Sequence, residues 1–124
     1  MHVFWKIILP KYKPILVVMV KEPRPGKVKT RLGNDIGMVN AAWWYRHQSL
    51  SILRSVINPK WNTVIAVTPD IEGRRSRVWP RELKRISQGM SDLGERMLKI
   101  LDSFRFSPIC IIGSDIPDVS SKNI

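Results

Sequence analysis

The run ILVVMV, residues 15–20, lies between Pro14 and Lys21 and contains six consecutive apolar residues. Four of the six are isoleucine or valine, whose β-branched side chains favour strands. The run is too short for a typical helix, and as a strand it would present apolar side chains on both faces. This pattern predicts a buried strand of a parallel sheet, because such strands are covered on both sides.

Similar apolar runs predict further strands at 63–68 and 108–113, and a short strand is expected at 85–88. Between the first two runs, apolar residues recur at steps of three, four and seven, which predicts a helix over about residues 36–57. Its predicted buried face consists of Ala42, Tyr45, Ile52, Leu53 and Val56.

A second helix is expected to begin at Asp92, because Asp92 and Glu95 have the spacing of a capping box. Its predicted buried stripe consists of Leu93, Met97, Ile100, Leu101 and Phe104. The polar, basic segments 21–34 and 72–85 are predicted to be loops, the second with a short helix after Pro80.

The order strand, helix, strand, loop, short strand, helix, strand is typical of an α/β domain. It predicts a three-layer α/β/α sandwich with a mainly parallel sheet, and the length of 124 residues fits a single domain over 1–124.

The charge balance is strongly positive, with 21 Lys and Arg against 10 Asp and Glu, a net charge of +11 and a pI of about 10.4. Such a chain favours anionic partners, whether nucleic acid, phosphorylated small molecules or acidic lipid. Cys110 is the sole cysteine, so no internal disulfide is possible, and we expect a cytoplasmic protein with Cys110 buried in a strand. No apolar run is long enough to span a membrane.

Two segments of opposite charge follow the predicted strands. GKVKTRL at 26–32 brings Gly26, Lys29 and Arg31, and SDIPD at 114–118 brings two aspartates. Ligands collect at the carboxyl ends of the strands in parallel sheets. The cations could therefore bind phosphate next to a carboxylate-bound metal ion, although basic loops are more often simply solvated.

Three motifs resemble one family in the same order: KEPRPGKVKTRLGNDIG at 21–37, QGMSDLGERM at 88–97 and IIGSDIP at 111–117. The chain resembles glycosyltransferase-like proteins often labelled selenodomain-associated transferases. These are relatives of the molybdenum-cofactor and phospholactate guanylyltransferases. The resemblance implies the GT-A fold of nucleotide-diphospho-sugar transferases.

The resemblance also implies roles for individual residues. Lys29 and Arg31 would contact the nucleotide phosphates, with Gly26 allowing close approach of the backbone. Asp115 would hold a divalent metal, Mg²⁺ or Mn²⁺, and Asp118 would be either a second ligand or a helix cap.

The middle motif leaves its own alternatives open. Asp92 and Arg96 are candidates for nucleotide binding, although Asp92 is equally suited to cap the helix that it precedes.

Members of that family continue beyond the point that corresponds to Ile124, so the resemblance implies a truncated domain. An uncovered sheet edge would favour association, and we therefore expect a homodimer. The acceptor, the donor base and a general base are not indicated by the sequence.

These observations support three hypotheses. The first is a glycosyltransferase or nucleotidyltransferase domain that binds a nucleoside-diphosphate sugar or a nucleoside triphosphate with a divalent metal. The second is a basic nucleic-acid-binding protein, motivated by the charge and by six basic residues within 74–85. The third is an inactive remnant of a transferase.

Overall fold

The computed structural model describes residues 13–114 of the chain. Its centre is a four-stranded sheet in the order β3-β2-β1-β4, in which all pairs of neighbouring strands are parallel. The strands are β1 (Ile15–Lys21), β2 (Asn62–Thr68), β3 (Lys84–Ser87) and β4 (Ile109–Gly113). Each lies within one residue of a strand that the sequence predicts.

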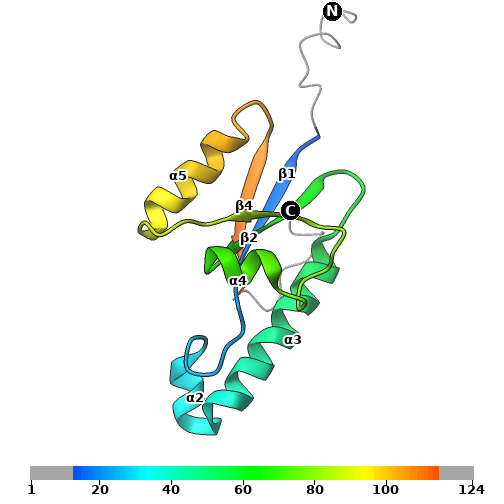
Figure 1. The fold of residues 1–124 in the computed structure, drawn as a ribbon. Helices are drawn as coiled ribbons and strands as arrows, with labels where there is room; N and C mark the ends of the chain where they lie inside the picture. The colour runs from blue at the N-terminus through cyan, green and yellow to red at the C-terminus, as the bar shows by residue number, and fades with distance from the viewer. Residues whose placement is uncertain (1–12, 115–124) are drawn as a thin grey trace, which may run out of the picture.

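Two long helices cover opposite faces of the sheet, α3 (Met38–Val56) and α5 (Leu93–Ser103) (Figure 1). Alternation along β1 divides its side chains between them. Leu16, Val18 and Val20 pack in the cluster that contains residues of α3. Val17 packs on the other face, in the cluster of Ile100 from α5. The predicted three-layer α/β/α sandwich with a parallel sheet is thus confirmed.

The α3 layer is the more completely packed of the two. All five residues predicted for its buried face are buried, and Ala41 and Ser49 join them. The α3 cluster also includes Trp79, from the segment before β3, which is 2% exposed. The main apolar core therefore lies between α3 and the centre of the sheet.

The α5 layer differs from the prediction. Of the predicted stripe only Ile100 is fully buried, and Leu93 and Leu101 are 60% and 40% exposed. Leu93 lies over a cavity at the first turn of α5 instead of on the sheet. Leu101 is turned about 100° from Ile100 around the helix axis and so points to the flank.

Two short helices lie in segments predicted to be loops. α2 (Thr30–Ile36) overlaps the end of the predicted loop 21–34, and α4 (Asp70–Arg75) precedes Pro80, whereas a helix was predicted after it. Both depend on close packing at a glycine. A Cβ on Gly33 would collide with the Met38 side chain, and one on Gly73 would lie 2.5 Å from the Cβ of Val67.

Cys110 is exposed, so the expectation of a buried thiol is wrong. It lies on β4, an outer strand of the described sheet, in register with Leu16 of β1. Leu16 faces α3 and is buried, whereas the outer strand next to it is not covered at Cys110. Within residues 13–114 no helix is long and apolar enough to cross a membrane.

Candidate functional site

A cavity of about 520 Å³ opens at the carboxyl edge of the sheet, where β1 and β4 end. Its floor is formed by the last residues of these strands, including Met19 and Ile112. One wall comes from the loop after β1, and another from the start of α5 with Leu93 and Met97. The cavity thus lies where parallel sheets most often bind ligands.

The lining of this cavity is cationic. Lys27 and Lys29 reach it from the loop after β1, Arg96 reaches it from α5, and Lys21 lies at the end of β1. Among the described residues no carboxylate lines it. A site with this charge favours an anionic ligand. We refer to it as the cationic pocket.

The loop after β1 is shaped by two residues with left-handed backbone conformation, Gly26 with φ of 78° and Lys29 with φ of 48°. Between them Val28 is buried against Ala42 and Tyr45 of α3. Val28 therefore fixes the loop on α3 and keeps its two neighbouring lysines at the pocket. The ammonium of Lys29 also lies 5.4 Å from the ring centroid of Trp44, within range of a cation–π interaction.

Tyr45 joins three parts of the pocket wall. Its hydroxyl accepts a hydrogen bond of 2.8 Å from the backbone N–H of Lys21. The same hydroxyl forms a buried hydrogen bond of 2.9 Å with Oγ of Ser114. The end of β1, the helix α3 and the residue that follows β4 are therefore held together at one point.

Gln88 fixes the orientation of Arg96. Gln88 is 5% exposed, and its Nε2 donates to the carbonyl oxygens of Val20 and Ala66 at 3.0 and 2.8 Å. Its remaining oxygen, Oε1, accepts a hydrogen bond of 3.2 Å from Nη1 of Arg96. Nε of Arg96 donates to the backbone oxygen of Ser91 at 2.6 Å. The guanidinium is thereby held in place.

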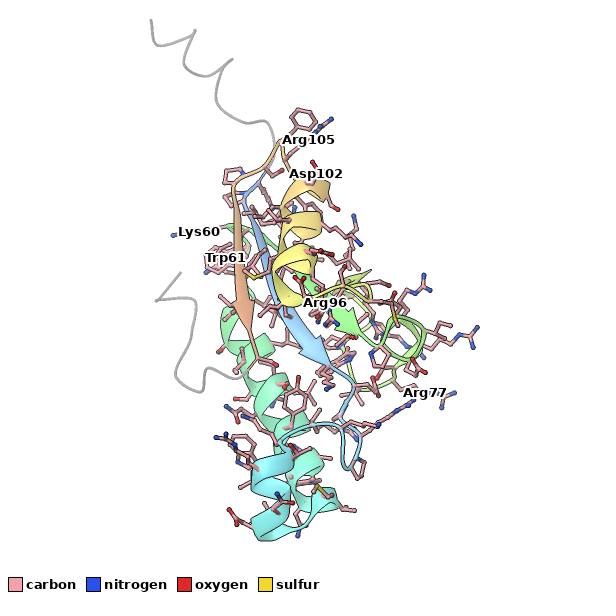
Figure 2. The ribbon with its side chains drawn as sticks, turned by 90° about the vertical axis from the view of Figure 1, so that its left-hand side faces the viewer. Lys60, Trp61, Arg77, Arg96, Asp102 and Arg105 are labelled. Carbon is pink, nitrogen blue, oxygen red and sulfur yellow. The ribbon has the colours of Figure 1, made fainter. Side chains whose placement is uncertain are left out.

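The Nη2 group of Arg96 makes no hydrogen bond within residues 13–114. It can therefore donate to a ligand in the cationic pocket, which Arg96 lines from the first turn of α5 (Figure 2).

The predicted site residues do not all gather in this pocket. Lys29 lines it, and Gly26 turns the loop without lining it. Arg31 instead lines a neighbouring hollow, which it shares with Lys29 and Trp44. Asp92 caps α5, because its Oδ1 accepts a hydrogen bond of 2.9 Å from the backbone N–H of Glu95.

The predicted metal ligands, Asp115 and Asp118, lie outside the described residues. Within residues 13–114 there is no group of three His, Cys, Asp or Glu side chains that could hold a metal ion. The described part of the site supplies cations and hydrogen-bond donors, which suit phosphate, and a metal would need carboxylates from elsewhere.

The pocket residues that were not predicted as site residues include Lys27, Tyr45, Gln88 and Ser114. Tyr45 has the helical spacing of a core residue, and its hydroxyl gives no sign in the sequence of where it points. Gln88 does carry a signal, since it is a polar residue that directly follows a short strand and opens the motif at 88–97.

Residues 52–124 match the family described as "Uncharacterized protein conserved in bacteria (DUF2064)". A solved structure from Desulfovibrio desulfuricans G20, described as a "putative nucleotide-diphospho-sugar transferase", is similar, with 32% sequence identity and a TM-score of 0.78. The similarity covers 90% of this chain and 51% of that one, so the chain spans about half the length of that protein. No curated protein matches the chain.

The similarity to this structure supports the predicted superfamily and its fold. The narrower resemblance, to selenodomain-associated transferases and their guanylyltransferase relatives, stays a prediction.

Proposed function

This chain belongs to the DUF2064 family, described as conserved in bacteria, and we propose that its cationic pocket binds the phosphates of a nucleotide for a transfer reaction. The substrate would be a nucleoside-diphosphate sugar or a nucleoside triphosphate, and the group transferred would be a glycosyl or a nucleotidyl group. The described similarity to a protein named as a nucleotide-diphospho-sugar transferase supports this proposal.

The observation that carries the proposal is the convergence of Lys27, Lys29 and Arg96 on one cavity at the carboxyl edge of the sheet. Arg96 is held by Gln88, with Nη2 available to a ligand, and the lysines are fixed through Val28. Cations positioned in advance bind phosphate oxygens through charge-assisted hydrogen bonds. They would also stabilise the negative charge that develops on a departing phosphate group.

A divalent metal, Mg²⁺ or Mn²⁺, is part of this proposal. Asp115 directly follows Ser114, whose side chain is bonded to Tyr45 at the pocket wall. We therefore propose Asp115 as the main carboxylate for the metal and Asp118 as a second. When bound, the metal would neutralise phosphate charge as a Lewis acid. Arg31, in the adjacent hollow, is proposed to contact the outer part of the same ligand.

Binding is tested by calorimetry with nucleoside mono-, di- and triphosphates and nucleotide sugars, with and without Mg²⁺. We expect Arg96→Ala to weaken binding by about tenfold or more, because it removes a charge-assisted contact. The matched control is Arg105→Ala, which removes the same charge at the other end of α5 (Figure 2). Equal losses of nucleotide affinity in the two variants would show that the cationic pocket is not the nucleotide-binding site.

The transferred group is identified by the product. Release of a nucleoside diphosphate from a nucleotide sugar would show glycosyl transfer, whereas release of pyrophosphate from a nucleoside triphosphate would show nucleotidyl transfer. The assay is run with water as the acceptor, so each product reports hydrolytic transfer of its group. Binding of nucleotides without either product would limit the proposal to a binding function.

A further inference from the structure

A second group of cations lies apart from the cationic pocket, on α4, on the segment that leads to β3 and on β3 itself. A hollow of about 560 Å³ is lined there by Arg74, Arg75, Arg77, Arg81 and Arg85. In the described range 13–114, no residue that lines this arginine hollow also lines the cationic pocket. Arg77 projects from it on the side away from Lys60 and Trp61 (Figure 2).

Arg85 builds the hollow from inside. Its Nη1 donates to the backbone oxygens of Gly73, Arg74 and Ser76 at 3.0, 3.1 and 2.8 Å. Its Nη2 donates to the backbone oxygen of Trp79 at 2.9 Å. The guanidinium of Arg85 thus binds four backbone carbonyl groups and holds the segment in a curve around it. Arg85 therefore has a structural role, whereas the side chains of the other arginines are exposed to solvent.

Two further contacts hold the segment in this curve. The ring of Trp79 is buried in the α3 cluster. Oγ of Ser76 donates a hydrogen bond of 3.0 Å to Oε1 of Glu22, just after β1, and accepts one from the backbone N–H of Val78. The hollow is therefore a fixed feature of the fold and not an extended loop.

The remaining four arginines of the hollow are exposed and make few hydrogen bonds within the described residues. They are Arg74, Arg75, Arg77 and Arg81. Within residues 13–114 their guanidinium groups make one hydrogen bond, from Nε of Arg74 to the backbone oxygen of Asp70. Among the residues that the structure describes, no carboxylate lines the hollow. Four like charges on one surface repel one another, and a bound anion would offset this repulsion.

We propose that the arginine hollow binds the sugar-phosphate backbone of a nucleic acid duplex. Guanidinium groups match the geometry of phosphate oxygens, and several of them on one surface fit successive phosphates. Trp79 is the aromatic residue of the hollow, and it is 2% exposed, so it offers no surface for stacking bases. Contacts to the backbone alone make the binding independent of base sequence.

The arrangement of the arginines suits a duplex. Arg74, Arg75, Arg77 and Arg81 are exposed around the hollow, so their guanidinium groups can reach neighbouring phosphates of a duplex that lies across it. An open hollow with exposed arginine side chains does not enclose a single small anion. The net charge of +11 adds long-range attraction to any polyanion.

The test is the salt dependence of binding to a fluorescein-labelled 20-base-pair DNA duplex, measured by anisotropy. The slope of log affinity against log salt is about −0.9 per phosphate neutralised. Replacing Arg74, Arg75, Arg77 and Arg81 by Ala should make the slope less steep by about 3.6 and weaken binding at least 100-fold at low salt. The control replaces Lys13, Arg46, Lys60 and Arg105 by Ala, which are exposed and do not line the hollow.

Both variants lower the net charge by four, so the comparison separates a local site from general attraction. A large change of slope in the hollow variant and a small one in the control supports the proposal. Equal changes, or no duplex binding by the wild type, would overturn it. Hollow-dependent binding to phosphatidylserine vesicles without duplex binding would also overturn it, in favour of a membrane.

Single variants test the same proposal in case the fourfold variant does not fold. Arg77→Ala and Arg81→Ala remove exposed side chains and should leave the thermal unfolding temperature unchanged, while each makes the slope less steep by about 0.9. Lys29→Ala should weaken nucleotide binding at the cationic pocket about tenfold and leave the slope for the duplex near the wild-type value. If one substitution at the pocket abolished both activities, the two sites would not be separate.

Discussion

The loop at 24–29 and the segment at 74–85 are both basic, yet the fold uses their cations differently. In the first, Val28 is buried against α3 and the flanking lysines line a cavity that is open to a small ligand. In the second, Arg85 is bonded to four backbone oxygens and the other arginines are exposed. The contacts that hold each backbone segment thus decide whether its cations line a cavity for a small ligand or lie exposed on the protein surface.

The largest effect is expected within the arginine segment itself. Arg85→Ala removes four hydrogen bonds and should lower the free energy of unfolding by about 3 kcal/mol, measured by urea denaturation. Arg81→Ala, a neighbouring exposed arginine, should change it by less than about 0.5 kcal/mol. Similar values for both variants would remove the distinction between the structural arginine and the exposed ones.

At the cationic pocket the strongest structural effect should come from Gln88. Gln88→Ala removes the donor to two strand carbonyls and should cost about 2 kcal/mol of stability, and nucleotide affinity should fall because Arg96 loses a partner. The control is Gln48→Ala, since Oε1 of Gln48 is buried without a hydrogen bond among the described residues. A loss of stability with unchanged nucleotide affinity would show that Gln88 does not position Arg96.

Lys29→Ala is expected to act on binding more than on stability. Loss of one charge-assisted contact should weaken nucleotide affinity about tenfold, as measured by calorimetry. Lys84→Ala is a suitable control, because Lys84 lies on β3 near the ring of Phe104 and does not line the cationic pocket. If nucleotide affinity fell equally in Lys84→Ala, the loss would result from the lower net charge of the protein and not from a contact made by Lys29.

The smallest expected effect is a gain of stability, whereas the variants above lose stability or affinity. Lys29 has a left-handed backbone with φ of 48°, which costs a non-glycine residue about 1 kcal/mol. Lys29→Gly should relieve this strain and leave the protein up to about 1 kcal/mol more stable than Lys29→Ala, with the same loss of nucleotide affinity. The comparison of the two variants in chemical denaturation separates backbone strain from ligand contact. A glycine variant less stable than the alanine variant would contradict it.

The elements with strong periodicity could be predicted closely. The runs that became β1 and β2 are apolar on both faces, and α3 repeats its apolar residues over five turns. Short elements could not be predicted in this way. α2 and α4 have seven and six residues, no side-chain cap, and close packing at Gly33 and Gly73 that no local pattern reveals.

The candidate site could be predicted only in part. Lys29 was identified from its place after a core strand, and it does line the pocket. Arg31, two residues further on, is turned into the next hollow because α2 begins at Thr30, between the two residues. Tyr45 and Gln88 became site residues through hydrogen bonds that join segments 24 and 68 residues apart, to Lys21 and Val20 respectively.

The sequence by itself determined the α/β class, the parallel strands and the positive charge of the loop after β1, because these follow from local patterns of apolar and basic residues. Only the tertiary structure decided which cations share a cavity and which surround the half-buried guanidinium of Arg85. The physical reason is that side-chain direction at the end of a strand depends on packing against distant elements. Val28 on α3 and Arg96 on Gln88 show this, since both partners lie in other elements of the chain.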